Sequence, residues 1–84
     1  MSTTNKAKRV PTQREQIIKY MREYGSITRL DAANRLLIFE LASRIGELQD
    51  RGWLFEKKWE SRKNLYGQTK SYVRYSIKKE GSSF

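Results

Sequence analysis

The sequence predicts a small α+β domain in which a three-helix core precedes a β-hairpin, and three observations support this prediction. An apolar stripe recurs at helical spacing in the middle of the chain, made of Ile38, Leu41, Ile45 and Leu48. Gly52 follows it, at the position where helices commonly end in a left-handed residue. The next segment, WLFEKKW (53–59), alternates between two faces as a strand does. A helix therefore leads directly into a strand.

The first helix is expected from about residue 13 to Tyr24. Thr12 and Glu15 have the spacing of a capping box, in which each side chain bonds the backbone N–H of the other residue. Gly25 closes the helix. Its predicted apolar side consists of Ile17, Ile18, Met21 and Tyr24.

A second capping signal, Thr28 with Asp31, opens a second helix that is expected over residues 29–36. The link before it, Ser26 and Ile27, is expected to add a strand of one or two residues to the hairpin. The side chains predicted to pack inward are those of Leu30, Ala33 and either Leu36 or Leu37. A glycine is usual in the turn between two such helices, and this turn contains none.

The third helix is expected over about residues 39–51. Gly46 lies in its middle, where glycine costs about 1 kcal/mol relative to alanine. Two explanations are open: tight packing against a neighbouring helix, or close approach of the backbone to a ligand such as DNA. The charges of this helix nearly cancel, because it contains two basic residues, Arg44 and Arg51, and three acidic residues.

The hairpin is expected to pair residues 53–59 with SYVRYSIKK (71–79). The first strand places Trp53, Phe55, Lys57 and Trp59 on one face, and the second places Val73, Tyr75 and Ile77 on one face. The segment between them, ESRKNLYGQTK (60–70), is interpreted as a long loop because it contains turn formers such as Asn64 and Gly67. Trp59 and Tyr66 either brace the hairpin or stack on a sugar or base.

Positive charge is concentrated outside the helices. The chain has 18 basic and 9 acidic residues, a net charge of +9. Residues 55–79 hold eight basic against two acidic residues, which leaves +6, and the N-terminal segment adds Lys6, Lys8 and Arg9. A strongly basic surface favours a polyanionic partner, most often nucleic acid. We therefore expect the hairpin and the N-terminal segment to supply the attraction for phosphate.

Composition argues against several other classes of protein. Histidine and cysteine are absent, so disulfides, thiolate metal sites and the commonest general base are all missing. No glycine-rich phosphate loop and no pair of carboxylates in a plausible cleft is visible. We expect no enzymatic activity, no cofactor and no metal. No apolar run approaches the ~18 residues of a membrane span, so no membrane partner and a cytoplasmic location are expected.

The segment ITRLDAANRLLIFELASRIGELQDRGW (27–53) resembles the winged helix-turn-helix family, most closely the small helix-turn-helix proteins of bacteriophages and prophages. QREQIIKYM in the first helix and YVRYSI in the returning strand extend the resemblance to residues 13–78. It implies that the third helix lies in the major groove of DNA and that the hairpin, the wing, contacts the backbone or minor groove. By position it implies contacts from Arg29, Glu40, Ser43, Arg44, Glu47, Arg62, Lys63 and Lys70, and the charge pattern adds Lys57, Lys58 and Arg74.

Two functions follow as hypotheses. The first is a double-stranded DNA-binding protein, either a phage-type transcriptional regulator or an excisionase-like factor. Arg44 is then the first candidate to read a base, since arginine pairs bidentately with guanine. The alternative is a phage accessory protein that inhibits a host protein or nucleoprotein complex. We expect a monomer or a dimer induced by DNA, in the host cytoplasm if the protein is phage-encoded, with residues 11–79 as the domain and 1–10 and 80–84 as disordered tails.

Overall fold

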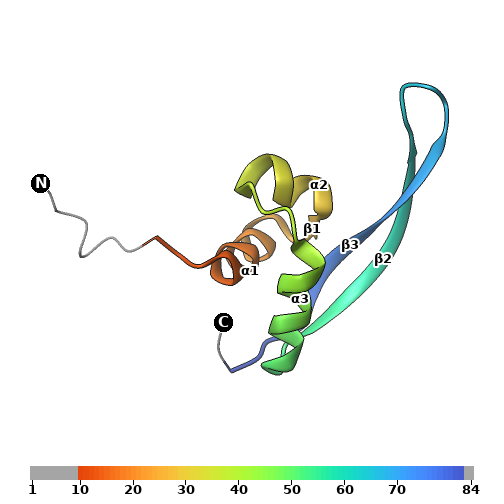
Figure 1. Cartoon of the computed structure of the whole chain (residues 1–84). Helices are drawn as coiled ribbons and strands as arrows, with labels where there is room; N and C mark the ends of the chain where they lie inside the picture. The colour runs from red at the N-terminus through yellow and green to blue at the C-terminus, as the bar shows by residue number, and fades with distance from the viewer. Residues whose placement is uncertain (1–9, 83–84) are drawn as a thin grey trace, which may run out of the picture.

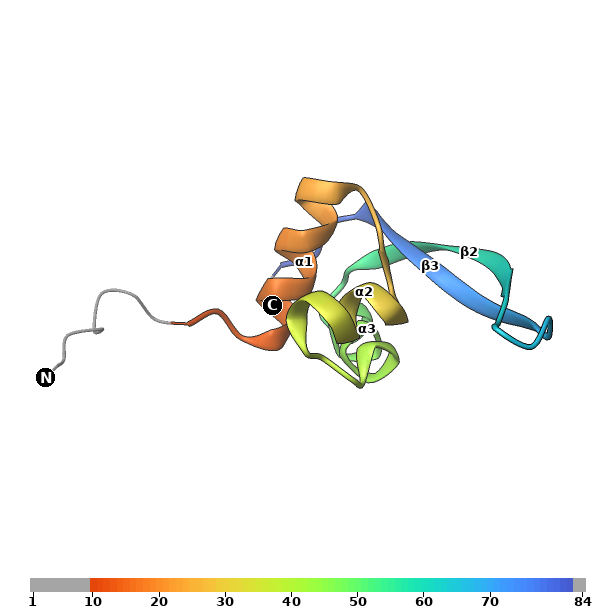
Figure 2. The same cartoon turned by 90° about the horizontal axis from the view of Figure 1, so that it is seen from above.

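The computed structural model describes residues 10–82, so the predicted DNA contacts of Lys6, Lys8 and Arg9 lie outside the described residues. Three helical segments gather at one end of the molecule, and a long two-stranded ribbon projects away from them (Figure 1). The same separation of helices and ribbon is seen from above (Figure 2). The elements are α1 (Gln13–Tyr24), β1 (Ile27–Thr28), α2 (Arg29–Asp31), the π-helix η1 (Ala32–Leu36), α3 (Leu41–Asp50), β2 (Leu54–Lys63) and β3 (Thr69–Lys79). This arrangement confirms the predicted order of three helices followed by a hairpin.

Helix α1 begins and ends as predicted. The backbone N–H of Glu15 donates to the Thr12 hydroxyl at 3.2 Å, and the N–H of Thr12 donates to the Glu15 carboxylate at 3.0 Å. Gly25 adopts a left-handed conformation at φ +90°. Three of the four predicted apolar residues are buried, but Tyr24 is 56% exposed. The prediction for Tyr24 was wrong because its ring lies at the surface, with its centroid 4.6 Å from that of Tyr20.

The second helix has the predicted extent but an irregular form. After a confirmed capping box at Thr28, only α2 is α-helical, and η1 continues with π-type hydrogen bonds. The core residue here is Ala32, whereas the predicted Leu30 is 56% exposed. Leu30 instead lines a surface hollow together with Arg62 and Arg74, so its side chain lies on the outer side of this segment.

Leu37 occupies the position at which a glycine was expected. Its φ is +56°, a left-handed conformation that costs a residue with a Cβ about 1–2 kcal/mol. The N–H groups of Leu37 and Ile38 both donate to the carbonyl of Ala32, which ends the helix. Helix α3 then starts at Leu41, two residues later than predicted. The segment between η1 and α3 is not helical, and it places the Ile38 side chain in the core.

The sheet has the strand order β1-β3-β2 and is antiparallel. Ile27 pairs with Tyr75 and Thr28 with Arg74, which confirms that the link after α1 joins the hairpin. The predicted loop over residues 60–70 was wrong: β2 continues to Lys63, β3 starts at Thr69, and only residues 64–68 form the turn. The strands are longer than predicted, because the pairing between them continues in register from Phe55 with Ile77 to Lys63 with Thr69.

The core lies between α1, α3 and the base of the hairpin. Its members are Ile17, Ile18, Met21, Ile27, Ala32, Ile38, Leu41, Ile45, Leu48, Trp53 and Phe55. Residues 80–82, expected to belong to a disordered tail, contact this end of the domain: the Glu80 carboxylate accepts from Arg22 at 2.9 Å, and the Ser82 N–H donates to the Arg51 carbonyl at 3.3 Å. Gly81 lies against Trp53 with no room for a Cβ.

Candidate nucleic-acid interface

A groove of about 430 Å³ separates the start of α3 from the hairpin. Three of the residues predicted to face DNA line it: Arg29, Glu40 and Ser43. The hairpin wall contributes aromatic and apolar side chains that include Trp59, Tyr72, Val73 and Tyr75. The structure therefore brings the N-terminal half of α3 and the hairpin together around one concave surface.

The basic side chains of the hairpin are divided between its two faces. Residues directly opposite each other in an antiparallel pair share a face. Lys57 and Lys63 lie on the face of Trp59, and Lys57 is held 6.0 Å from the centroid of the Tyr75 ring. The opposite face carries Lys58, Arg62, Lys70 and Arg74. The hairpin thus presents positive charge in both directions.

Arg62 and Lys70 are direct cross-strand partners, and both are exposed. Like charges in this arrangement destabilise a hairpin. Among residues 10–82, no ion pair involves Arg62, Lys63 or Lys70. This part of the hairpin therefore holds positive charge that the described part of the protein does not neutralise.

In contrast, the charges of α3 neutralise one another. Nη1 of Arg44 donates to the two carboxylate oxygens of Glu47 at 2.9 and 3.0 Å, and its Nη2 donates to Glu40 at 3.1 Å. Glu47 also accepts from Nη1 of Arg14 at 2.7 Å, which ties α3 to α1. The Arg14 hydrogen bond holds the pKa of the Glu47 carboxyl below its usual value. Arg44 and Glu47, both predicted to face DNA, are thus engaged within the protein.

Arg74 is also engaged. Its Nε and Nη2 donate to the two oxygens of Glu60 at 2.9 and 3.0 Å, and its Nη1 donates to the Ser26 hydroxyl at 3.1 Å. These bonds raise the pKa of Arg74 and lower that of Glu60. The pair anchors the hairpin to the segment before β1. With Arg29 and Arg62, Arg74 also borders a second hollow, of about 390 Å³, on the face of the hairpin opposite to Trp59.

The outward surface of α3 carries small side chains and is nearly neutral. Ala42 and Ser43 are exposed, and Gly46 follows one turn later. A Cβ built on Gly46 would meet no heavy atom within 4 Å. Packing against a neighbouring helix therefore does not explain this glycine, which leaves the close approach of a ligand as the open explanation.

Several exposed apolar residues were missed or left ambiguous by the sequence. Phe39, at the lip of the groove, is 70% exposed, and Trp59 is 71% exposed. Leu65 and Tyr66, in the hairpin turn, are 91% and 86% exposed, so neither Trp59 nor Tyr66 covers the core. Only Leu65 and Tyr66 carried a signal in the sequence: they are two large apolar residues between the turn formers Asn64 and Gly67.

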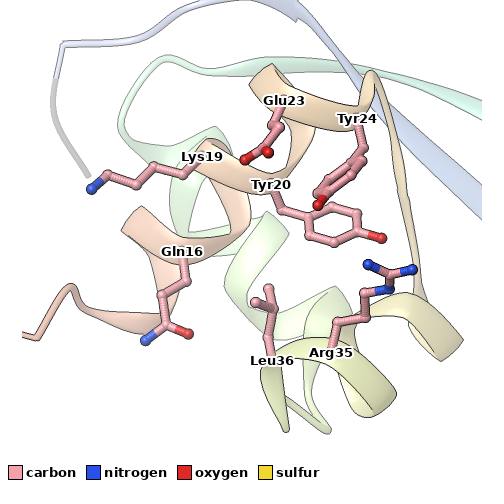
Figure 3. Close-up of a pocket in the computed structure, with 7 residues that line it drawn as sticks. All are labelled: Gln16, Lys19, Tyr20, Glu23, Tyr24, Arg35 and Leu36. Carbon is pink, nitrogen blue, oxygen red and sulfur yellow. The ribbon is translucent and has the colours of Figure 1, made fainter.

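A third hollow, of about 330 Å³, lies between α1 and η1 (Figure 3). The Tyr20 and Tyr24 rings lie side by side in it, and the Arg35 guanidinium carbon is 5.6 Å from the Tyr24 centroid. Its other charged residues, Lys19 and Glu23, are of opposite sign, so together with Arg35 the hollow carries a single net positive charge, less than the hairpin does.

Two other kinds of site are absent from the described part of the chain. Over residues 10–82, no group of three or more His, Cys, Asp or Glu side chains could hold a metal ion. No helix among these residues is both long and apolar enough to cross a membrane.

A helical core with a protruding basic hairpin defines the class of helix-turn-helix domains that carry a wing. The chain belongs to the winged helix-turn-helix domain family, whose sequence model matches residues 12–80. No curated protein and no solved structure matched the chain significantly. Domains of this family typically bind DNA and are not enzymes, so DNA is the partner that membership indicates.

Proposed function

We propose that this protein binds double-stranded DNA with its hairpin holding the phosphate backbone and α3 facing the major groove. The observation that supports this most strongly is the distribution of free charge. Arg44, the one cation of α3, is paired with carboxylates, whereas Arg62, Lys63 and Lys70 have no ion pair among the described residues. Phosphate contacts dominate the affinity of DNA-binding proteins and release counterions. Affinity is therefore assigned to the hairpin.

Base selection is assigned to the groove. Arg29 and Ser43 line it, and neither side chain has a hydrogen bond within the described structure. Arg44 could read a base only after giving up its bonds to Glu40 and Glu47. We therefore place Arg29 ahead of Arg44 as the first residue to test for sequence preference.

The experiment is a mobility-shift titration at two salt concentrations, with the DNA upstream of the protein's own gene and with a random duplex. Lys63→Ala should weaken binding to both duplexes equally and reduce the log–log salt slope by about 0.9, because one phosphate is no longer neutralised. Arg29→Ala should reduce the preference for the upstream duplex, where one good base contact is worth about 1–3 kcal/mol. Lys19→Ala is the control, because it removes the same charge from the exposed side of α1.

Two results would count against the proposal. Equal affinity of the wild-type protein for the two duplexes would remove sequence selectivity. An unchanged salt slope in Lys63→Ala, together with a reduced slope in Lys19→Ala, would place the phosphate contacts on the helices.

The same proposal includes a role as a phage-type transcriptional regulator or excisionase-like factor. It also includes the oligomeric state: the protein is monomeric alone and forms a dimer only on DNA. Sedimentation with and without duplex tests the pairing.

One observation favours a second candidate, a protein that inhibits a host protein or nucleoprotein complex. Leu37 and Phe39, close together before α3, are 69% and 70% exposed. A pull-down from nuclease-treated host lysate tests this candidate. A stoichiometric partner that is lost in Phe39→Ser, combined with no shift of any DNA, would support it over DNA binding.

A further inference from the structure

We propose that the tip of the hairpin is an apolar wedge that enters the minor groove, and that Leu65 and Tyr66 bend the duplex by separating two base pairs. This inference rests on the proposed DNA binding and names how the hairpin would act on the DNA it holds. It concerns the turn over residues 64–68, which the hairpin carries far from the helices (Figure 1).

Leu65 and Tyr66 are the most exposed large apolar side chains in the described part of the protein, at 91% and 86%. Leaving a leucine in water rather than burying it forgoes about 1.5–3 kcal/mol. Neither side chain supports the fold, since neither joins the core or the residues packed against it. A partner that covers them is therefore the physical reason for apolar residues at this position.

The turn holds the backbone that carries the two side chains in a defined conformation. Oδ1 of Asn64 accepts from the backbone N–H groups of Tyr66 and Gln68, both at 2.9 Å. The N–H of Asn64 donates to the Gln68 carbonyl at 2.8 Å, and the Gly67 N–H donates to the Asn64 carbonyl at 3.0 Å. Gly67 supplies the left-handed residue, at φ +78°. Such a turn loses little conformational entropy when its tip is inserted into a partner.

Charge complementarity identifies the partner as a polyanion. The strand residues next to the turn include the cross-strand pair Arg62 and Lys70, with Lys63 immediately before Asn64. An acidic protein could also meet this charge. DNA matches the hairpin tip more closely, because it has two phosphate backbones on either side of an apolar stack of bases. The hairpin likewise has cations on both strands and apolar residues between them at its end. Minor-groove proteins combine these two features to unstack a base step.

The hairpin is long enough for this contact. β1 pairs with β3 only at Arg74 and Tyr75, and β2 continues for five residues beyond Lys58, the partner of Arg74. At about 3.3 Å per residue the two strands extend roughly 17 Å beyond their last pairing with β1 before the turn begins. The minor groove is about 7.5 Å deep. The tip can therefore reach the floor of a minor groove while the base of the hairpin stays with the helices.

The test measures DNA bending separately from DNA binding. Energy transfer between dyes at the ends of a duplex of about 30 base pairs reports the bend in a saturated complex. Wedges of this kind kink DNA by about 20–90°. The double variant Leu65→Ser with Tyr66→Ser should lose most of the bend and keep the salt slope, because no charge is removed. Its thermal stability should match that of the wild type, since both side chains are exposed. Leu54→Ser, at the base of the same hairpin and 49% exposed, is the matched control and should bend DNA normally.

The outcomes separate the two proposals. Wild-type protein that binds duplex and leaves it straight overturns the wedge alone. A double variant that bends DNA as the wild type does overturns it as well, and assigns the tip to another contact, such as a protein. Absence of any DNA binding by the wild type overturns the proposed function and the wedge together. Loss of the bend in the double variant with the salt slope retained supports the wedge.

Discussion

Gly46 allows the structure to be tested by a substitution that should raise stability while lowering DNA affinity. Glycine in a helix interior is about 0.8–1.0 kcal/mol less favourable than alanine. A Cβ at this position would meet nothing within 4 Å, so no steric penalty offsets the gain. Gly46→Ala should therefore raise the free energy of unfolding by about 0.8–1.0 kcal/mol, which corresponds to about 4–8 °C in Tm for a domain of this size.

The opposite effect is expected on DNA. If the outward surface of α3 faces the major groove, a larger side chain at residue 46 keeps the duplex at a distance. Gly46→Leu should retain most of the gain in stability, because leucine is a good helix former. It should bind DNA at least tenfold more weakly, which corresponds to about 1.4 kcal/mol. Gln13→Leu, at the exposed start of α1, adds a similar apolar side chain away from the groove and should leave DNA affinity unchanged.

Urea denaturation and mobility-shift titration of these three variants give the two readouts. A loss of stability in Gly46→Ala would refute the reasoning that residue 46 borders open space. Full DNA affinity in Gly46→Leu would refute the assignment of this surface of α3 to DNA, and would leave the fold untouched.

Three further predictions concern stability and are checked by urea denaturation. Leu37→Gly should be more stable than Leu37→Ala by about 1 kcal/mol, the reverse of the order at Gly46, because the φ of +56° penalises any Cβ; equal stability would show that the turn relaxes freely. Gly81→Ala should cost about 1–3 kcal/mol, because its Cβ would overlap the Trp53 side chain and lie 2.8 Å from the Trp53 backbone nitrogen; a neutral result would mean that residues 80–82 detach without cost. The pKa of Glu60 is lowered in the folded state by the Arg74 hydrogen bond, so its contribution is present above the ordinary value of 4.5 and is lost as the pH falls through the folded pKa. Glu60→Gln should therefore be less stable than the wild type at pH 7, and the difference should shrink below pH 4.5; a constant difference would contradict the pair.

Local signals account for much of what could be predicted. The capping boxes at Thr12 and Thr28, the left-handed glycines at residues 25 and 52, and the stripe through α3 all depend on residues within a few positions of each other. Such signals act in any tertiary context, because they satisfy backbone groups at helix ends or lie on one side of a helix. The order of elements therefore followed from the sequence.

Errors arose where a residue's environment is set by distant parts of the chain. The length of the hairpin was underestimated because residues 60–63 look like a loop until their cross-strand partners are known. Leu37 was not recognised as the turn residue, since its left-handed conformation is imposed by the packing of Ile38 into the core rather than by its own preference.

The candidate site shows the same division. By itself, the sequence determined the family, the helix ends and the excess of positive charge in the hairpin, because composition and local spacing carry that information. The bonds of Arg44 to Glu40 and Glu47 are local, since these residues are four and three positions apart, and the sequence already allowed them. Only the tertiary structure decided that Arg14, 33 positions from Glu47, joins the same cluster, and that Arg62 and Lys70 lie opposite each other in the hairpin. Ion pairing depends on distances of a few ångströms between side chains, and those distances are set when the helices pack.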